Sequence, residues 1–202
     1  MGRVADPTIR EELVRAAGGY VLEHGLAGLS LRPLAAALGT SPRMLLYHFG
    51  SKEQLVMAAL DETRRRQAEL LGTYLAEQPD ADPAEIFRRL WRWLVSPEHL
   101  PFLRLFLEVY ALSLQYPERF PGFAESDVRD ILGWLDRIPF EIDVPREEHE
   151  NLVTLLLATH RGLYLDLLAT GDRARVDRAQ QTFMHALETY YSREENDDGI
   201  TR

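Results

Sequence analysis

Cysteine is absent from the 202 residues, which excludes disulfide bonds, thiol nucleophiles and cysteine-based zinc sites. Long apolar runs are missing too. The longest, residues 152–158, is far shorter than the roughly 20 residues that span a bilayer. The N-terminus leads directly into a polar helical pattern and has no apolar signal region. From these absences we expect a cytoplasmic protein.

The motifs of common enzyme classes are also missing. There is no glycine-rich phosphate loop, no GxSxG turn and no HExxH helix. No histidine follows a glutamate at the three-residue spacing of helical di-iron sites. The sequence therefore favours a protein that is not an enzyme, with neither a metal site nor a cofactor.

Acidic residues outnumber basic ones, giving a net charge of −9, but the excess is uneven. Residues 1–66 hold nine Lys/Arg against seven Asp/Glu, whereas residues 67–202 hold fourteen against twenty-five. Such asymmetry is expected when one segment approaches nucleic acid and another does not. Chance segregation is the other interpretation, because the positive excess is small.

Nearly every apolar pattern has the helical period, and no alternating stretch is long enough for a sheet. Prolines and glycines separate the helices, and Thr8 with Glu11 has the spacing of a capping box before the first, which Gly25 ends. We expect an all-α fold of about nine helices, with residues 139–145 as a loop and 196–202 as a disordered tail. The expected helices are 8–24, 31–38, 42–49, 51–78, 84–95, 98–115, 122–138, 146–170 and 173–193.

Residues 30–55 carry the most informative pattern. Ser30 is placed to cap a short helix, and Gly39 can adopt the positive φ that a sharp turn requires. A second helix then opens with Ser41 as its N-cap and Pro42 at its first position. The small Ala35 allows the two helices to cross closely. This spacing predicts a helix-turn-helix, whose second helix enters the DNA major groove.

The same segment resembles the N-terminal signature of the tetracycline-repressor (TetR) family of transcription regulators. The resemblance rests on Ala35, Gly39, Ser41, Leu45 and the run HFGSKEQL at 48–55, and it covers roughly residues 8–60. It implies a three-helix DNA-binding domain at 1–50 and an effector-binding and dimerisation domain at 51–195. Two positions depart from the family pattern. The family usually has an aromatic residue where this chain has Leu46, so no contact is carried over to Leu46, and it usually has a small aliphatic residue where this chain has Thr40.

The candidate DNA contacts follow from the geometry of the motif. Residues at the start of the second helix, Ser41, Pro42, Arg43 and Met44, are the ones that reach base edges. Arg43 suits the O6 and N7 atoms of guanine, and Met44 suits a thymine methyl. Arg32, in the first turn of the preceding helix, is a candidate for a base or a phosphate, and Tyr47, His48 and Lys52 are candidates for the DNA backbone. The family resemblance implies that His48 and Lys52 contact phosphates. A solvated Arg43 and a packing or capping His48 are the alternatives.

The expected helix at 146–170 is apolar nearly all round from residue 152 to 168. A helix without a polar face must be buried on all sides. We therefore expect it to pair with a second copy of the chain, together with the last helix, and we place Leu163 and Leu167 on its outer face. The alternative is a central core helix of the monomer.

The middle helices are rich in aromatic residues, and most are expected to fill the core. The family resemblance implies that this region also holds a mainly apolar effector pocket. The candidate effector residues are Phe106, Leu107, Tyr110, Trp134 and His160. The resemblance further implies a repressor that binds a pseudo-palindromic DNA operator as a homodimer and is released when an effector tilts the fourth helix.

A second class of function is compatible with the same helices. In a helical small-molecule-binding protein or enzyme, residues 30–55 would only be a packing element. The polar, cationic helix start at Ser41, Pro42 and Arg43 argues against it, because that start would be exposed without a purpose. The sequence does not identify the operator, the effector, the regulated genes or the sign of regulation.

Overall fold

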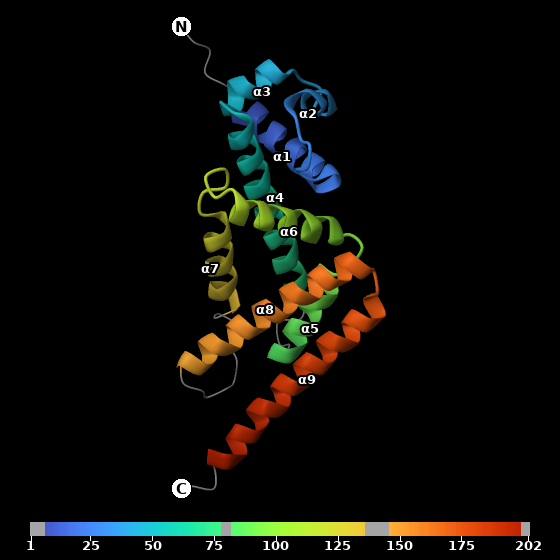
Figure 1. Ribbon diagram of the computed structural model, residues 1–202, viewed down its shortest axis with the longest axis vertical. Coiled ribbons are helices and arrows are strands. Elements are labelled where there is room, and N and C mark those ends of the chain that lie inside the picture. Colours follow the sequence, from blue (N-terminus) through green and yellow to red (C-terminus); the bar gives the residue numbers. More distant parts are fainter. Residues whose placement is uncertain (1–6, 78–81, 136–145, 199–202) are drawn as a thin grey trace. The chain divides into compact units, whose positions relative to one another are not determined.

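The computed structural model describes residues 7–77, 82–135 and 146–198. These residues form helices and connecting turns, with no strand among them (Figure 1). The helices are α1 (Pro7–His24), α2 (Leu31–Ala37), α3 (Pro42–Phe49), α4 (Lys52–Ala76), α5 (Pro83–Leu94), α6 (Leu100–Gln115), α7 (Phe123–Leu135), α8 (Arg146–Thr170) and α9 (Arg173–Asp198). The expected all-α fold is confirmed.

Most helix boundaries lie within two or three residues of those expected from the sequence, and α8 has the expected bounds. The beginning of α1 differs. It starts at Pro7, so Thr8 lies inside the helix and is not the N-cap of a capping box. α9 differs at its other end, since it continues to Asp198 and includes three residues of the expected disordered tail. The loop expected at 139–145 and residues 199–202 lie outside the described residues.

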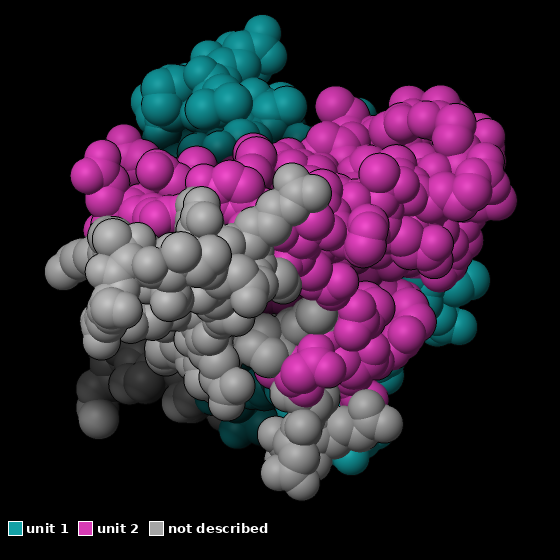
Figure 2. Space-filling view, turned by 90° about the horizontal axis from the view of Figure 1, so that it is seen from below, with its two compact units in different colours: residues 1–79, 96–124 teal, residues 80–95, 125–202 magenta. Residues whose placement is uncertain are grey.

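The chain forms two compact units (Figure 2). Unit 1 comprises residues 1–79 and 96–124, and unit 2 comprises residues 80–95 and 125–202. Helices α4 and α6 therefore belong to the same unit as the predicted helix-turn-helix. The expected functional division into residues 1–50 and 51–195 remains a prediction.

Unit 1 has two apolar clusters arranged along α1 and α4. The first joins α1, α2, α3 and the start of α4, and its most buried members are Leu34, Ala35, Leu45 and Leu55. The second joins α1 and α4 to α6 and the turn that follows it, around Val21, Leu60, Val109 and Phe120. Because α1 and α4 contribute to both clusters, the helix-turn-helix and α6 rest on the same two helices.

Unit 2 is built around α5, α8 and α9. Its apolar cluster has Phe87, Leu152, Leu156 and Met184 at the centre. Polar groups are buried beside it in pairs. The Arg161 guanidinium binds the Asp127 carboxylate at 2.5 Å, and the Trp91 indole N–H donates to Asp177 at 2.7 Å. These pairs satisfy charges and donors that burial would otherwise leave unpaired.

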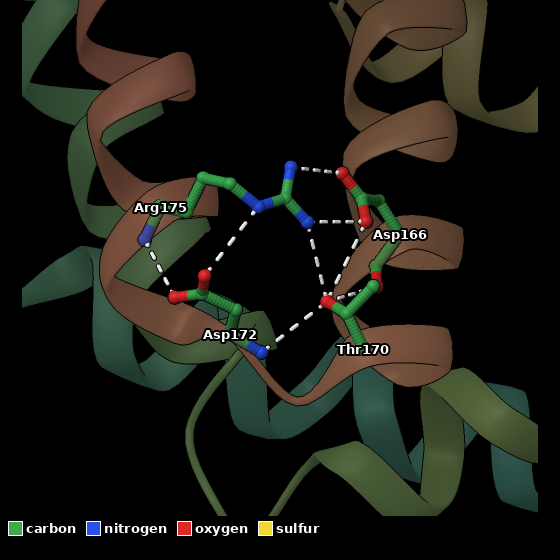
Figure 3. A network of polar contacts seen from close by, with 4 residues as sticks. All are labelled: Asp166, Thr170, Asp172 and Arg175. Atoms are coloured by element: carbon green, nitrogen blue, oxygen red, sulfur yellow. Dashed lines mark hydrogen bonds and ion pairs between the residues drawn. The ribbon is translucent and has the colours of Figure 1, made fainter.

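The turn between α8 and α9 is held by a polar network (Figure 3). The Arg175 guanidinium binds both carboxylate oxygens of Asp166, at 2.8 and 2.6 Å, and this bond holds the pKa of Asp166 below its ordinary value. Asp172 accepts the Arg175 backbone N–H at 3.1 Å and donates its own to the Thr170 hydroxyl. A single exposed ion pair contributes little to stability. Here the bidentate geometry and the neighbouring bonds together tie the end of α8 to the start of α9.

Part of the apolar surface of α8 is exposed to solvent in the single chain. By length and composition alone, the stretch Glu147–Thr170 is long and apolar enough to cross a membrane. A count of uninterrupted apolar residues does not detect this stretch. The same properties occur in core helices of soluble proteins, so they are weak evidence for a membrane span. Leu155 and Leu165 are 48% and 59% exposed, whereas Leu167 is only 5% exposed. The expectation that Leu167 lies on the outer face is therefore wrong.

Candidate DNA-binding interface

The turn between α2 and α3 has the predicted geometry. Gly39 has φ +65°, a conformation that residues with a side chain rarely adopt. The Thr40 N–H donates to the Ala35 carbonyl at 2.9 Å, which closes the end of α2. Leu34 and Ala35 of α2 are buried in the same apolar cluster as Leu45 of α3, so the two helices pack against each other. The sequence thus folds locally into a helix-turn-helix.

Helix α3 is oriented by its cap and by two apolar anchors. The Ser41 hydroxyl oxygen accepts the Met44 N–H at 3.3 Å, and Pro42 occupies the first turn. Leu45 and Phe49, four residues apart, are 1% and 4% exposed and face the core of unit 1. The opposite side of α3 must therefore face solvent.

That opposite side presents the predicted DNA contacts. Arg43 and Tyr47 are also four residues apart and exposed, with Met44 between them at 42% exposure. Together they form an outward ridge that combines a bidentate donor, an apolar tip and an aromatic ring. Arg43 and Met44 have the chemistry that suits base edges in the major groove, and the Tyr47 hydroxyl suits the phosphate backbone beside them.

The charge around this ridge suits a phosphate backbone. The chain has no aspartate or glutamate between Glu23 and Glu53, while Arg32, Arg43 and Lys52 fall inside that interval. Arg32 is exposed in the first turn of α2. Exposed cations such as Arg32 and Arg43 can replace the counterions of DNA where they reach its phosphates.

His48 differs from its neighbours. Both ring nitrogens are covered, and neither has a hydrogen-bond partner among the described residues. The ring stands edge-on to Tyr47, with 5.2 Å between the centroids. The packing alternative accounts for this orientation, and the predicted phosphate contact would require the ring to rotate outward. That contact stays a prediction.

Lys52 is tied to the rest of unit 1. Its ammonium donates to the Leu29 carbonyl at 3.1 Å, so one of its three donors holds the loop between α1 and α2. The remaining donors leave the predicted phosphate contact chemically possible. Lys52 is also the first residue of α4, where the Ser51 hydroxyl accepts the Gln54 N–H at 3.1 Å.

Two neighbouring residues were not predicted. Leu46 is 41% exposed on α3, although the sequence supplied no contact for it. Arg10 of α1 holds its guanidinium 5.1 Å from the centre of the Phe49 ring, which places a further cation beside the end of α3. Because successive residues of a helix point in different directions, the residue after the buried Leu45 turns toward solvent. The exposure of Leu46 could therefore have been predicted from the helical periodicity. The Arg10 contact has no local sequence signal.

The two serine caps differ, and the difference can be tested. Ser30 stands at the N-cap position of α2, but its side chain makes no cap hydrogen bond, contrary to expectation. We expect Ser41→Ala to lower the free energy of unfolding by about 1 kcal/mol and Ser30→Ala by clearly less. Urea unfolding of the two variants measures this. Equal losses would contradict the difference between the two caps.

The predicted effector residues fall into two groups, one in each unit. Phe106, Leu107 and Tyr110 lie on α6 in unit 1, where the Phe106 and Tyr110 rings are 5.9 Å apart. Trp134 is on α7 in unit 2, with its side chain outside the description. His160 is on α8 in unit 2. The structure thus brings the α6 residues together and does not show all five as one site.

His160 lies in an aromatic cluster of unit 2. Its ring is 5.8 Å from that of Trp91 and 6.1 Å from that of Phe183. Burial holds the pKa of His160 below its ordinary value, although a bond with the Leu156 carbonyl at 2.8 Å acts in the other direction. The ring is therefore neutral at pH 7. Because Nδ1 faces the carbonyl and carries the proton, Nε2 is a buried acceptor, without a partner in the described part of the chain.

Comparison with known proteins agrees with this geometry. Residues 11–59 match the sequence profile of the bacterial regulatory proteins of the tetR family. The chain is 28% identical over 115 residues to the HTH-type transcriptional regulator BetI of Stenotrophomonas maltophilia, covering 56% of this chain and 58% of BetI. It is 33% identical over 124 residues to the HTH-type transcriptional repressor Rv3405c of Mycobacterium tuberculosis, covering 59% of each.

A solved structure extends the similarity over most of the chain. The multidrug binding protein EbrR, crystallised with imidazole, is 26% identical and has a TM-score of 0.67, covering 92% of this chain and 93% of EbrR. The chain spans less than two thirds of the curated relatives, 58% of BetI and 59% of Rv3405c. The matched segment contains the helix-turn-helix and the start of α4, and the fold agrees beyond it. Residues 11–59 of the chain are thus similar to the bacterial regulatory proteins of the tetR family, and the fold is similar to that of EbrR over most of the chain.

Proposed function

We propose that this protein is a sequence-specific DNA-binding transcription regulator, and that it acts as a repressor. The observation that carries the proposal is the outward ridge of α3, where Arg43, Met44 and Tyr47 are exposed opposite the buried Leu45 and Phe49. In a helix-turn-helix this ridge enters the major groove. Its place of action would be the cytoplasm, where the bacterial chromosome lies.

The alternative of a helical binding protein or enzyme has less support. Packing alone would explain Leu45 and Phe49, but it leaves the exposed ridge and the acid-free interval from Glu23 to Glu53 without a purpose. The curated relatives carry the names of transcriptional regulators and repressors. Both observations favour DNA binding.

Selection of genomic fragments tests the proposal. The purified protein should retain a small set of fragments that share a pseudo-palindrome, and its affinity should fall as salt rises because bound cations are released. Lys52→Ala should weaken all sequences alike and reduce the slope of log affinity against log salt by about one for each half-site. Arg178→Ala, which removes an exposed cation of α9, is the control. Binding without sequence preference would contradict the proposal.

We infer that the regulator is a homodimer joined through α8. The exposed residues Leu155, Ala158, Gly162, Leu165 and Ala169 follow one another at spacings of three and four, the repeat of helices that pack side by side. Small residues at three of these positions let a second helix approach closely. A two-fold pair of α8–α9 hairpins would form a four-helix bundle and cover Leu155 and Leu165.

We also infer that a small, largely apolar effector binds among the helices of residues 84–170 and weakens DNA binding. Support comes from the aromatic residues of α6 and from the cluster around His160. The neighbour EbrR is described as a multidrug binding protein and has also been crystallised with proflavin. An effector of this class can change DNA affinity only by its unequal affinity for the two states, typically about 1–3 kcal/mol.

Proflavin is a suitable first probe of effector binding. We expect it to raise the unfolding temperature and to weaken binding to the selected fragment roughly 5- to 150-fold. Leu107→Trp adds bulk at a partly buried position of α6 and should abolish this response while DNA affinity without proflavin is unchanged. Leu114→Trp, at a 65% exposed position of the same helix, is the matched control. A full response in Leu107→Trp would contradict the assignment.

A further inference from the structure

The end of α1 is completed by a residue far away in the sequence. The helix stops at His24, and Gly25 follows with φ +71°, its N–H donating to the Val21 carbonyl at 2.9 Å. After such a glycine the next N–H commonly returns to a carbonyl of the last helical turn. Here the Leu26 N–H donates instead to the carboxylate of Glu108 on α6, 82 residues away.

This contact is short and two-sided. The Leu26 nitrogen is 2.9 Å from Oε2 and 3.1 Å from Oε1 of Glu108. A hydrogen bond to a charged acceptor is about twice as strong as one between neutral groups. The carboxylate also faces the negative end of the α1 dipole, which opposes the bond. The charge of the carboxylate therefore strengthens its hydrogen bond to the Leu26 N–H, whereas its repulsion by the C-terminal end of α1 weakens the same bond.

Gly25 is required by the same contact. A Cβ atom at this position would lie 2.8 Å from Oε2 of Glu108, and its φ is one that side chains disfavour. Glycine tolerates this φ without strain, and its lack of a Cβ lets the Glu108 carboxylate approach without moving aside. The loop between α1 and α2 is thus shaped to receive a side chain of α6.

Space lies beneath the loop. A cavity of about 320 Å³ is lined by residues 26–29 of the loop, by Lys52 and Val56 of α4, and by Glu108 and Leu112 of α6. On its other side the loop is tied by Lys52, which donates to the Leu29 carbonyl at 3.1 Å. Two polar ties therefore hold the loop backbone, one to α4 and one to α6, and the cavity leaves room for α6 to shift.

We propose that Glu108 is a latch that couples α6 to the helix-turn-helix through the Leu26 N–H. The loop leads directly into Ser30 and α2, so releasing the Glu108 bond leaves the entry to the DNA-binding helices with only one of the two polar ties, that of Lys52. Glu108 is one turn or less from Phe106, Leu107 and Tyr110 on the same helix. This inference rests on the proposed function and gives the path by which a change at α6 reaches the DNA.

The first measurement needs no DNA. In Glu108→Leu the Leu26 amide should exchange with solvent roughly 10- to 100-fold faster, because its charged acceptor is gone. Glu108→Gln retains one oxygen acceptor and should lie between Glu108→Leu and the parent chain. The control is Glu118→Leu, which removes the same charge at an exposed position of unit 1. Exchange within twofold of the parent in Glu108→Leu would overturn the latch.

The second measurement tests coupling with a mixed-sequence duplex at low salt. In the parent chain the duplex should slow exchange both at α3 and at the α6 amides of Val109 and Tyr110. In Glu108→Leu it should slow exchange at α3 only, whereas Glu118→Leu should resemble the parent. Equal protection of α6 in all variants would overturn the coupling.

The two measurements separate this inference from the proposed function. A duplex that binds no variant contradicts the proposed function, while the Leu26 amide still decides whether the latch exists. If Glu108→Leu does not fold, the comparison moves to Glu108→Gln. That variant must exchange faster than Glu118→Leu at Leu26, and an equal rate would refute the latch.

Discussion

Replacing Arg43 with alanine is expected to remove the base preference at one position of each half-site while leaving the fold unchanged. The side chain is exposed on α3 and contributes nothing to the core around Leu45 and Phe49. A bidentate arginine–guanine contact is worth about 1–3 kcal/mol of discrimination. A dimer makes the contact twice, so the loss should be roughly 30- to 20,000-fold on the best site.

The measurement is a titration of the selected fragment and of fragments altered at single base pairs. The parent should discriminate strongly at one position of each half-site, and Arg43→Ala should treat the four bases there alike. Arg178→Ala removes an equal charge from exposed α9 and should keep the preference. If Arg43→Ala binds the best site as tightly as the parent, α3 does not read bases through Arg43.

The second large effect is expected on α8. Leu165→Asp should convert the dimer into a folded monomer, because Leu165 is 59% exposed within one chain and the proposed partner helix would cover it. Burying an unpaired carboxylate at such an interface costs several kcal/mol, once from each subunit. With one recognition helix per particle, specific DNA binding should fall with it.

Sedimentation equilibrium distinguishes the two states, since one chain has a mass of 23.2 kDa and a dimer twice that. Leu114→Asp places the same charge at an exposed position of α6 and should remain dimeric. Leu167→Asp should instead unfold unit 2, because Leu167 is 5% exposed inside one chain. A folded monomer of the unaltered protein at micromolar concentration would contradict the dimer.

The DNA-binding motif was predictable because its determinants are local. Caps, turn glycines and apolar anchors lie within a few residues of one another, and Gly39, Ser41, Leu45 and Phe49 occupy their expected places. The sequence predicted two helix N-caps, at Thr8 and Ser30, that the structure does not have. Pro7 begins α1 and displaces Thr8 from the N-cap, and the Ser30 side chain leaves its cap bond unmade.

The face of α8 was not predictable, since a helix that is apolar all round has no hydrophobic side to identify. Its orientation is visible only in the fold, where Tyr164 stacks on Trp91 of α5 and Leu167 is buried, whereas Leu155 and Leu165 are exposed. The contact of Glu108 with Leu26 is equally hidden, because it joins residues 82 positions apart and leaves no periodic signal. Aromatic content likewise indicated α6 and α8 as candidate effector helices but not which rings meet.

Helix α4 has the dimensions of a lever arm, and its first turns pack against α3, the proposed DNA-reading helix. Its 25 residues form one uninterrupted helix, about 37 Å long at 1.5 Å per residue. Rotating such a rod by about 5° around its far end carries Lys52 about 3 Å, close to the roughly 3.4 Å rise of one base pair. In a dimer both rods would move. Because α3 packs on α4 around Leu55, such a rotation would carry each α3 with it by nearly one base-pair step.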